Sequence, residues 1–141
     1  MSGNLQLRTK AWLSRARSDL RLARIASEAA DPPFDSAIYH CQQAAEKAVK
    51  AFLHDHEATV QRTHDIARLA REASTFEPRF GNFAADAQLL TPLITAYRYP
   101  DEAEWEPLPE PTRVEFDSAL TAAQRIYDFV LSLLPIETHP T

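Results

Sequence analysis

The sequence predicts an all-α fold, an antiparallel up-and-down bundle of about five helices, four main helices and one short one. Apolar residues recur at helical spacing along most of the 141 residues, and no stretch shows the alternation typical of a half-buried strand. Only two glycines interrupt the chain, whereas alanine, leucine and arginine, which favour helix, are frequent. We expect a single domain over residues 1–141, with a core from about 8 to 134 and a loose tail over 135–141.

The first helix is expected to run from Leu5 to about Ala30, and the prolines of the Asp31-Pro-Pro-Phe-Asp35 segment would end it. Its apolar side keeps a helical spacing through Leu13, Ala16, Leu20 and Ala23. The arginines of this segment lie mainly off that side, which is therefore the side expected to face the core.

A second helix, capped by Asp35 or Ser36 and ending near His56, carries the most informative pattern in the chain. One face is apolar and mostly small, so another helix can approach it closely. That face consists of Ala37, Cys41, Ala44, Ala45, Ala48 and Phe52, flanked by Ile38 and Val49. The opposite face carries Tyr39, His40, Gln43, Glu46, Lys47, Lys50 and His54. Such a polar line is either the solvated side of an amphipathic helix or a set of groups suited to phosphates and bases.

Two shorter helical segments follow. Thr63 is a suitable N-cap for a helix over residues 64–74, which would place His64 in its first turn. A fourth helix is expected to begin at Gly81 and to end near Tyr97, with a kink or a break at Pro92. The acidic, proline-rich residues 101–111 then form a loop.

The last helix has the clearest start signal. Thr112 and Glu115 have the spacing of a capping box, in which each side chain satisfies a backbone N–H near the other residue. Pro135 would end this helix. Its inward residues would be Val114, Leu120, Ala123, Ile126, Tyr127, Val130, Leu131 and Leu134.

Charge is unevenly spread, although the net charge is only −5. Residues 8–24 are strongly basic and residues 101–117 strongly acidic, so the two segments either steer a polar partner or neutralise each other. The single cysteine, Cys41, cannot form an internal disulfide, which fits a reducing cytoplasm. No apolar run is long enough for a membrane span. We therefore expect a cytoplasmic protein.

Most familiar catalytic motifs are missing. The sequence has no glycine-rich phosphate loop, no nucleophile elbow and no Cys or His pair with metal-ligand spacing. His54 and His56 lie two residues apart, so on a helix their rings diverge by about 200°. We expect neither a metal nor a cofactor. Arg98, between a helix end and Tyr99-Pro100, could brace a phosphate or pair with the acidic residues nearby.

Four segments together resemble the HEPN domain family over about residues 8–134. They are the pattern Trp12…Ala16…Asp19-Leu20…Ala23, the run from Tyr39 to Leu53 (Tyr-His-Cys-Gln-Gln-Ala-Ala-Glu-Lys-Ala-Val-Lys-Ala-Phe-Leu), Thr63-His-Asp65…Leu69, and Arg98-Tyr-Pro-Asp101. The resemblance implies a helical bundle that commonly dimerises, with a polar groove between the two copies. It also implies a toxin–antitoxin-like pair with a small nucleotidyltransferase.

Active members of the HEPN family are metal-independent endoribonucleases with an Arg followed four to six residues later by a His. Arg98 corresponds to that Arg and is the one catalytic candidate, but no His occurs between His64 and His139. Arginine cannot replace an imidazole in proton transfer, because its pKa lies above about 12. His40, His54 or His64 would have to act from another helix.

With this resemblance, we expect a nucleotide- or RNA-binding homodimer that is the partner subunit of a small nucleotidyltransferase. Its site would consist of Tyr39, His40, Gln43, Glu46, Lys47, Lys50, Arg98 and Tyr99. Two alternatives remain, an endoribonuclease toxin with displaced proton-transfer groups and a structural dimerisation module whose polar line is only surface. Glu46 would either orient Arg98 across the groove or form a solvated i,i+4 pair with Lys50.

Overall fold

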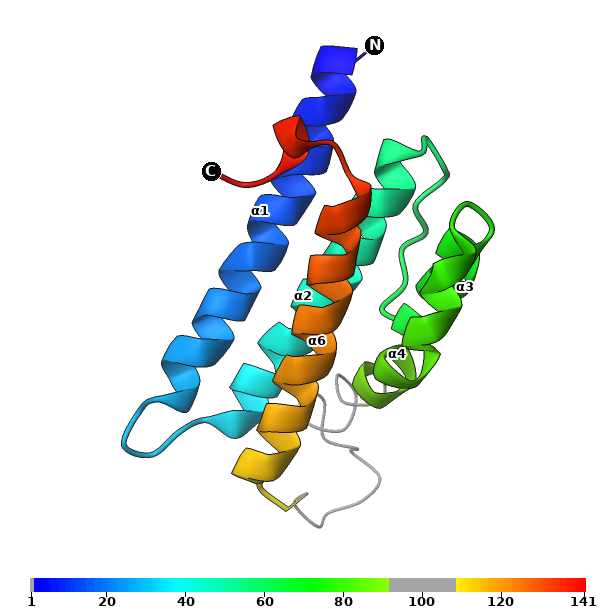
Figure 1. Cartoon of the computed structure of the whole chain (residues 1–141). Helices are drawn as coiled ribbons and strands as arrows, with labels where there is room; N and C mark the ends of the chain where they lie inside the picture. Colours follow the sequence, from blue (N-terminus) through cyan, green and yellow to red (C-terminus); the bar gives the residue numbers. More distant parts are fainter. Residues whose placement is uncertain (1, 92–108) are drawn as a thin grey trace.

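The fold is helical throughout the part of the chain that the structure, a computed structural model, describes, residues 2–91 and 109–141 (Figure 1). Its helices are α1 (Ser2–Ser27), α2 (Phe34–Asp55), α3 (Ile66–Ser74), α4 (Ala84–Leu90) and α6 (Arg113–Leu133), with 3₁₀ helices η1 (Pro78–Phe83) and η2 (Ile136–Thr138). No strand occurs among these residues. The predicted all-α fold is confirmed. None of the described helices is long and apolar enough to cross a membrane.

Helix α2 is the centre of the bundle and contacts α1, α3, α4 and α6. α1 and α2 are antiparallel, and α6 returns beside both, in the direction of α2 (Figure 1). The starts of α2 and α6 meet where the Phe34 and Phe116 rings lie 5.7 Å apart. The Arg113 guanidinium there donates to the Ser27 carbonyl at the end of α1 (2.7 Å). The short α3 and α4 cover the side of α2 away from α1.

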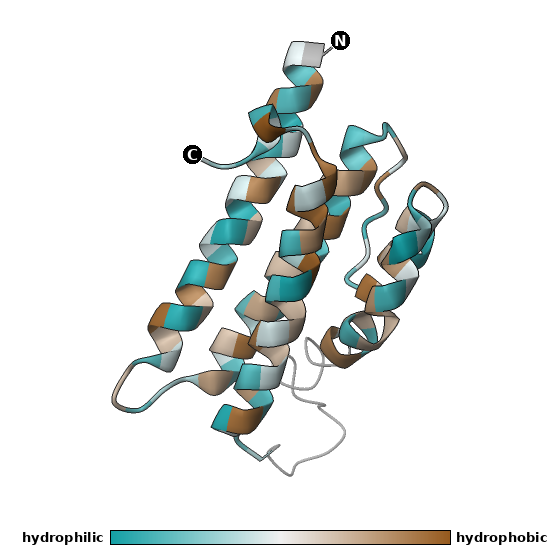
Figure 2. Cartoon of the chain, in the orientation of Figure 1, coloured by the Kyte–Doolittle hydropathy of each residue, from teal (hydrophilic) through white to brown (hydrophobic). Residues whose placement is uncertain are grey.

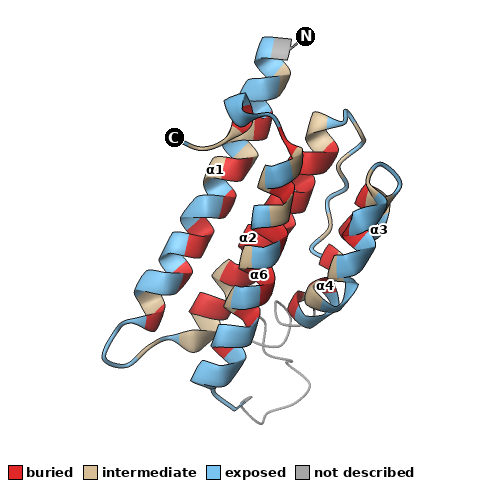
Figure 3. Cartoon of the chain, viewed as in Figure 1, coloured by how far each residue is buried: buried red, intermediate tan, exposed pale blue. Residues whose placement is uncertain are grey.

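The small apolar face of α2 is buried as predicted, and every residue of that face is at most 2% exposed. Buried positions form a continuous stripe along α2 and α6 (Figure 3), while hydrophilic residues dominate the outer side of α1 (Figure 2). Alanines let the backbones approach, so Cys41 is fully enclosed. Burial raises the pKa of the Cys41 thiol to about 12, which makes it a structural residue.

α1 begins at Ser2 rather than at Leu5 and ends at Ser27 rather than near Ala30. Three other helix starts also differ from the prediction. α2 begins after Pro33 with no side-chain cap, and Asp35 lies inside its first turn. α3 begins at Ile66, because the Asp65 carboxylate caps it by accepting from the Arg68 N–H (3.0 Å). Thr63 instead accepts from the Asp65 N–H, so His64 precedes α3. The third difference is η1, which occupies the expected start of the fourth helix and delays α4 to Ala84. Pro92 and Tyr97 lie outside the described residues.

The capping-box helix is confirmed. Thr112 caps α6 by accepting from the Glu115 N–H (3.2 Å), and the helix ends at Leu133, before Pro135. The inward assignment is wrong for Val114, which is 73% exposed, because it lies two residues from the buried Phe116 and so about 200° away around α6. Leu120 and Leu131 are half-buried.

The C-terminal tail is packed against the bundle, contrary to the prediction of a loose segment. Thr138 in η2 is fully buried, and η2 contacts α1. At the end of α6 the His139 Nε2 donates to the carbonyl of Leu131 (2.9 Å), which also accepts from the Leu134 N–H, and to that of the C-cap residue Leu134 (3.1 Å). Arg17 of α1 donates to the Thr141 carbonyl (3.1 Å). These contacts fix the tail.

Candidate functional site

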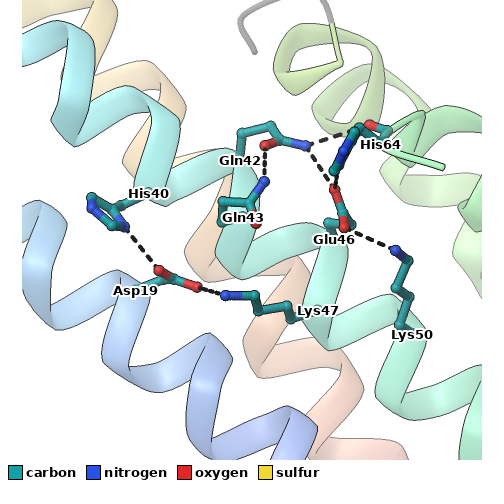
Figure 4. A network of polar contacts seen from close by, with 8 residues as sticks. All are labelled: Asp19, His40, Gln42, Gln43, Glu46, Lys47, Lys50 and His64. Carbon is teal, nitrogen blue, oxygen red and sulfur yellow. Dashed lines mark hydrogen bonds and ion pairs between the residues drawn. The ribbon is translucent and has the colours of Figure 1, made fainter. Parts of the chain in front are cut away.

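The polar face of α2 is divided between two hydrogen-bonded networks, which Figure 4 shows. The first is centred on Asp19 of α1, whose side chain is 9% exposed. One carboxylate oxygen lies 2.8 Å from His40 Nδ1, and the other accepts from Lys47 Nζ at 2.7 Å. An ionised carboxylate only accepts hydrogen bonds, so His40 donates from Nδ1 and its Nε2 is left for another group. This network fixes two α2 side chains against α1.

The second network is centred on Glu46, which is buried. Its carboxylate accepts from Lys50 Nζ (2.9 Å) and from Gln42 Nε2 (3.2 Å), and lies 2.8 Å from His64 Nδ1. Lys50 is also buried, whereas the His64 side chain is 64% exposed. His64 belongs to the segment between α2 and α3, and it connects the buried carboxylate to the surface.

The polar line of α2 is therefore only partly solvated. Gln43, Glu46 and Lys50 are buried. The Trp12 ring of α1 lies against the Lys50 ammonium, and His64 lies against the Glu46 carboxylate. Of the two roles considered for Glu46, the i,i+4 pair with Lys50 forms, but it is not solvated, since the two side chains are only 5% and 9% exposed. Tyr39, His40 and Lys47 are half-buried and lie along the edge.

Sequence reasoning missed Asp19 and Gln42. Asp19 is the only acidic residue among the basic residues 8–24, and this isolation was the available signal that it pairs with cations elsewhere. Gln42 lies between the two faces of α2, so no periodic pattern selects it. Arg98 and Tyr99, which complete the predicted site, lie outside the described residues.

A surface hollow lies between α1 and α2, next to both networks. It has a volume of about 460 Å³ and is lined by Arg8, Ala11, Trp12, Arg15, Lys47 and His54; we call it the α1–α2 hollow. The ammonium of Lys50 lies 5.9 Å from the centre of the Trp12 ring, so the Glu46 network reaches the wall of the hollow. Among the described residues, no acidic side chain lines it.

His54 lines this hollow and a smaller one beside it, of about 380 Å³, together with Asn4, Leu5, Arg8 and Glu57. The Nε2 atom of His54 is buried and has no hydrogen-bond partner among the described residues. Buried polar atoms usually have one. Within residues 2–91 and 109–141, no group of His, Cys, Asp and Glu side chains is arranged to hold a metal ion.

Comparison with known proteins identifies a family for this chain. The family model of the HEPN domain matches residues 9–133. A crystal structure from Thermus thermophilus superposes with a TM-score of 0.81 at 29% identity, over 91% of this chain and 99% of the other. The structure of an archaeal HEPN homologue superposes with a TM-score of 0.70, also at 29% identity, over 89% and 96% of the two chains. No functionally curated protein matches this chain.

Proposed function

Since the chain belongs to the HEPN domain family, we propose that it binds a nucleotide or RNA as the partner subunit of a small nucleotidyltransferase in a toxin–antitoxin-like pair. The observation that carries the binding proposal is the fixed set of donors on one side of α2. Asp19 holds His40 and Lys47, and Glu46 holds Lys50 and His64.

Two features favour binding over an inert surface. Burying a charged group costs free energy unless it is paired, so a simple solvated helix face would leave these carboxylates and ammonium groups in water. At the surface, Lys47 keeps ammonium N–H groups besides the one that Asp19 accepts, and His40 and His64 present their Nε2 atoms while the two carboxylates hold the rings in place. Preorganised donors of this kind suit phosphate oxygens.

Binding is tested by titrating the protein with a labelled single-stranded RNA and with a nucleoside triphosphate, at several salt concentrations. We expect Lys47→Ala and Arg98→Ala to weaken binding about 10-fold each, because each removes a charge-assisted contact. Arg71→Ala is the matched control, because Arg71 is exposed on α3, away from α1. Equal affinity in all four proteins would contradict the proposal and favour the structural dimerisation module.

The partner proposal has a separate test. A small nucleotidyltransferase encoded beside this chain should co-purify with it, and light scattering should give the mass of a homodimer for the chain alone. Exposed apolar residues three apart on α1, Leu22 and Ile25, offer surface for such an assembly. A monomeric chain that forms no complex with the transferase would refute this part of the proposal.

One observation favours an endoribonuclease as the second candidate. Glu46 orients the exposed His64 ring through Nδ1, and this leaves Nε2 for proton transfer, as in a carboxylate–histidine pair. The chain alone would then arrest growth and cleave RNA in the presence of a chelator. His64→Ala and Arg98→Ala would each abolish cleavage, whereas His56→Ala would not. Intact RNA in cells that express the unmodified chain would exclude this candidate.

A further inference from the structure

We propose that the α1–α2 hollow binds one unpaired nucleotide, with its base against Trp12 and its phosphate between Arg8, Arg15 and Lys47. This inference rests on the proposed function and deepens it. It assigns nucleotide recognition to residues of α1 that the polar line of α2 does not include. The ligand is either a free nucleotide or a nucleotide within single-stranded RNA, since the recognised chemistry is the same.

The lining of the hollow is suited to a phosphate next to an aromatic base. Arg8, Ala11, Trp12 and Arg15 follow each other at steps of three, one and three residues, which places them on one face of α1. Neither arginine forms an ion pair with any described residue, so their guanidinium groups are available to phosphate oxygens. The Lys47 ammonium is paired with the Asp19 carboxylate, so most of the unpaired positive charge that lines the hollow comes from the two arginines of α1.

Trp12 gives the hollow an apolar wall. Its ring is half-buried, and Lys50 lies against it, held in turn by Glu46. A side chain fixed in this way loses little conformational freedom when a base stacks on it. Aromatic stacking is tolerant of sequence, because every base has a π-face, and it is the usual way in which proteins bind single strands. A duplex, whose bases are already stacked, cannot offer this contact.

The size and the far end of the hollow limit the ligand. A volume of about 460 Å³ lies within the range for small-molecule sites, roughly 300–1,000 Å³. Beyond Arg8 the adjoining hollow includes the carboxylate of Glu57, which repels a second phosphate. His54 lines both compartments, and a polar group of the ligand would satisfy its buried Nε2. We therefore infer a site for one nucleotide at a time.

The test uses the full chain and a labelled six-residue oligoadenylate, with binding followed by fluorescence anisotropy. Arg15→Gln should weaken binding about 10-fold and reduce the slope of log K against log salt by about 0.7, the value for one lost phosphate contact on a single strand. Arg21→Gln is the matched control, since Arg21 carries the same charge on the same helix but lines a different hollow, next to the C-terminal tail. It should change affinity less than about 2-fold, a difference expected for remote surface charge.

Stacking is tested separately. Trp12→Ala should weaken binding by about 5- to 100-fold, whereas Trp12→Phe, which keeps an aromatic face and guards against a folding defect, should retain most of the affinity. The chain has one other tryptophan, Trp105. With Trp105 replaced by Phe, the tryptophan fluorescence comes from Trp12 alone, and ligand binding should quench it. Adenosine monophosphate displaces the oligonucleotide if the site takes free nucleotides, and fails to do so if it needs a strand. A duplex of equal length should bind more weakly.

Failure of this inference differs from failure of the proposed function. If RNA binds and Lys47→Ala weakens it, but Arg15→Gln and Trp12→Ala have no more effect than Arg21→Gln, the hollow is not the site and the broader proposal stands. If neither the oligonucleotide nor the nucleotide binds, both are wrong.

Discussion

The Glu46–Lys50 pair gives the sharpest stability prediction, because both members are buried. Replacing Glu46 by Leu leaves the Lys50 ammonium enclosed without its counter-ion, which lies 2.9 Å away. At an effective dielectric constant of about 20, two unit charges at that distance attract by about 6 kcal/mol before desolvation is subtracted. Breaking one side of a buried pair typically costs about 3–5 kcal/mol. We expect Glu46→Leu to lower the free energy of unfolding by about 3–5 kcal/mol and Tm by roughly 10–15 °C.

The assay is urea unfolding of four proteins: the unmodified chain, Glu46→Leu, Lys50→Met and the double variant. The double variant removes both charges and fills the space with apolar side chains, so it should recover to within about 2 kcal/mol of the unmodified chain. Glu72→Gln is the control, because it breaks an exposed pair with Arg68 (3.5 Å) and should cost less than about 1 kcal/mol.

Two outcomes would refute this reasoning. One is a loss for Glu46→Leu no larger than that for Glu72→Gln, which would mean that the pair contributes as little as a surface pair. The other is a double variant as unstable as the single one, which would mean that the hydrogen bonds from Gln42 and His64, and not the charge on Lys50, determine the cost. Added salt should change the result little, since buried charges are weakly screened.

Three further predictions concern the fold. Burial raises the pKa of Cys41 to about 12, so the unfolded chain loses the thiol proton at lower pH than the folded chain does, and the thiol's contribution to stability is complete below about pH 9 and falls as pH rises towards 12. A thiol reagent should label Cys41 only on unfolding, and prompt labelling of native protein would contradict this. Thr112→Ala should cost about 1 kcal/mol of stability because it removes the α6 cap, whereas Thr121→Ala should be near neutral, since Thr121 is exposed on the same helix. Equal losses of stability in thermal unfolding would argue against the cap. Phe80→Ala should cost about 3–5 kcal/mol because Phe80 is only 2% exposed, clearly more than the half-exposed Phe76→Ala, and similar urea midpoints would show that the ring is not part of the core.

Helical periodicity in the sequence was enough to predict much of the fold. The spacing of small apolar residues on α2 identified a face that is fully buried, and the capping box at Thr112 located the start of α6. These features are local, since propensity, amphipathicity and capping involve residues within one or two turns. The start of α3 was misplaced for an equally local reason. Thr63 and Asp65 are both good caps, and Asp generally ranks above Thr, as Asp65 does here.

The site depended on tertiary structure. Periodicity placed Glu46 and Lys50 on a polar face, but whether that face meets water depends on how closely Trp12 of α1 and His64 approach α2. In the same way, the sequence showed His139 only as a tail residue, and the fold brings its ring to the carbonyls of Leu131 and Leu134. The sequence alone determined which residues lie on which face of each helix, because this follows from 3.6 residues per turn. Packing between helices decided which charges are paired, buried or open, because Asp19 and Lys47 are 28 residues apart and only the fold brings them together.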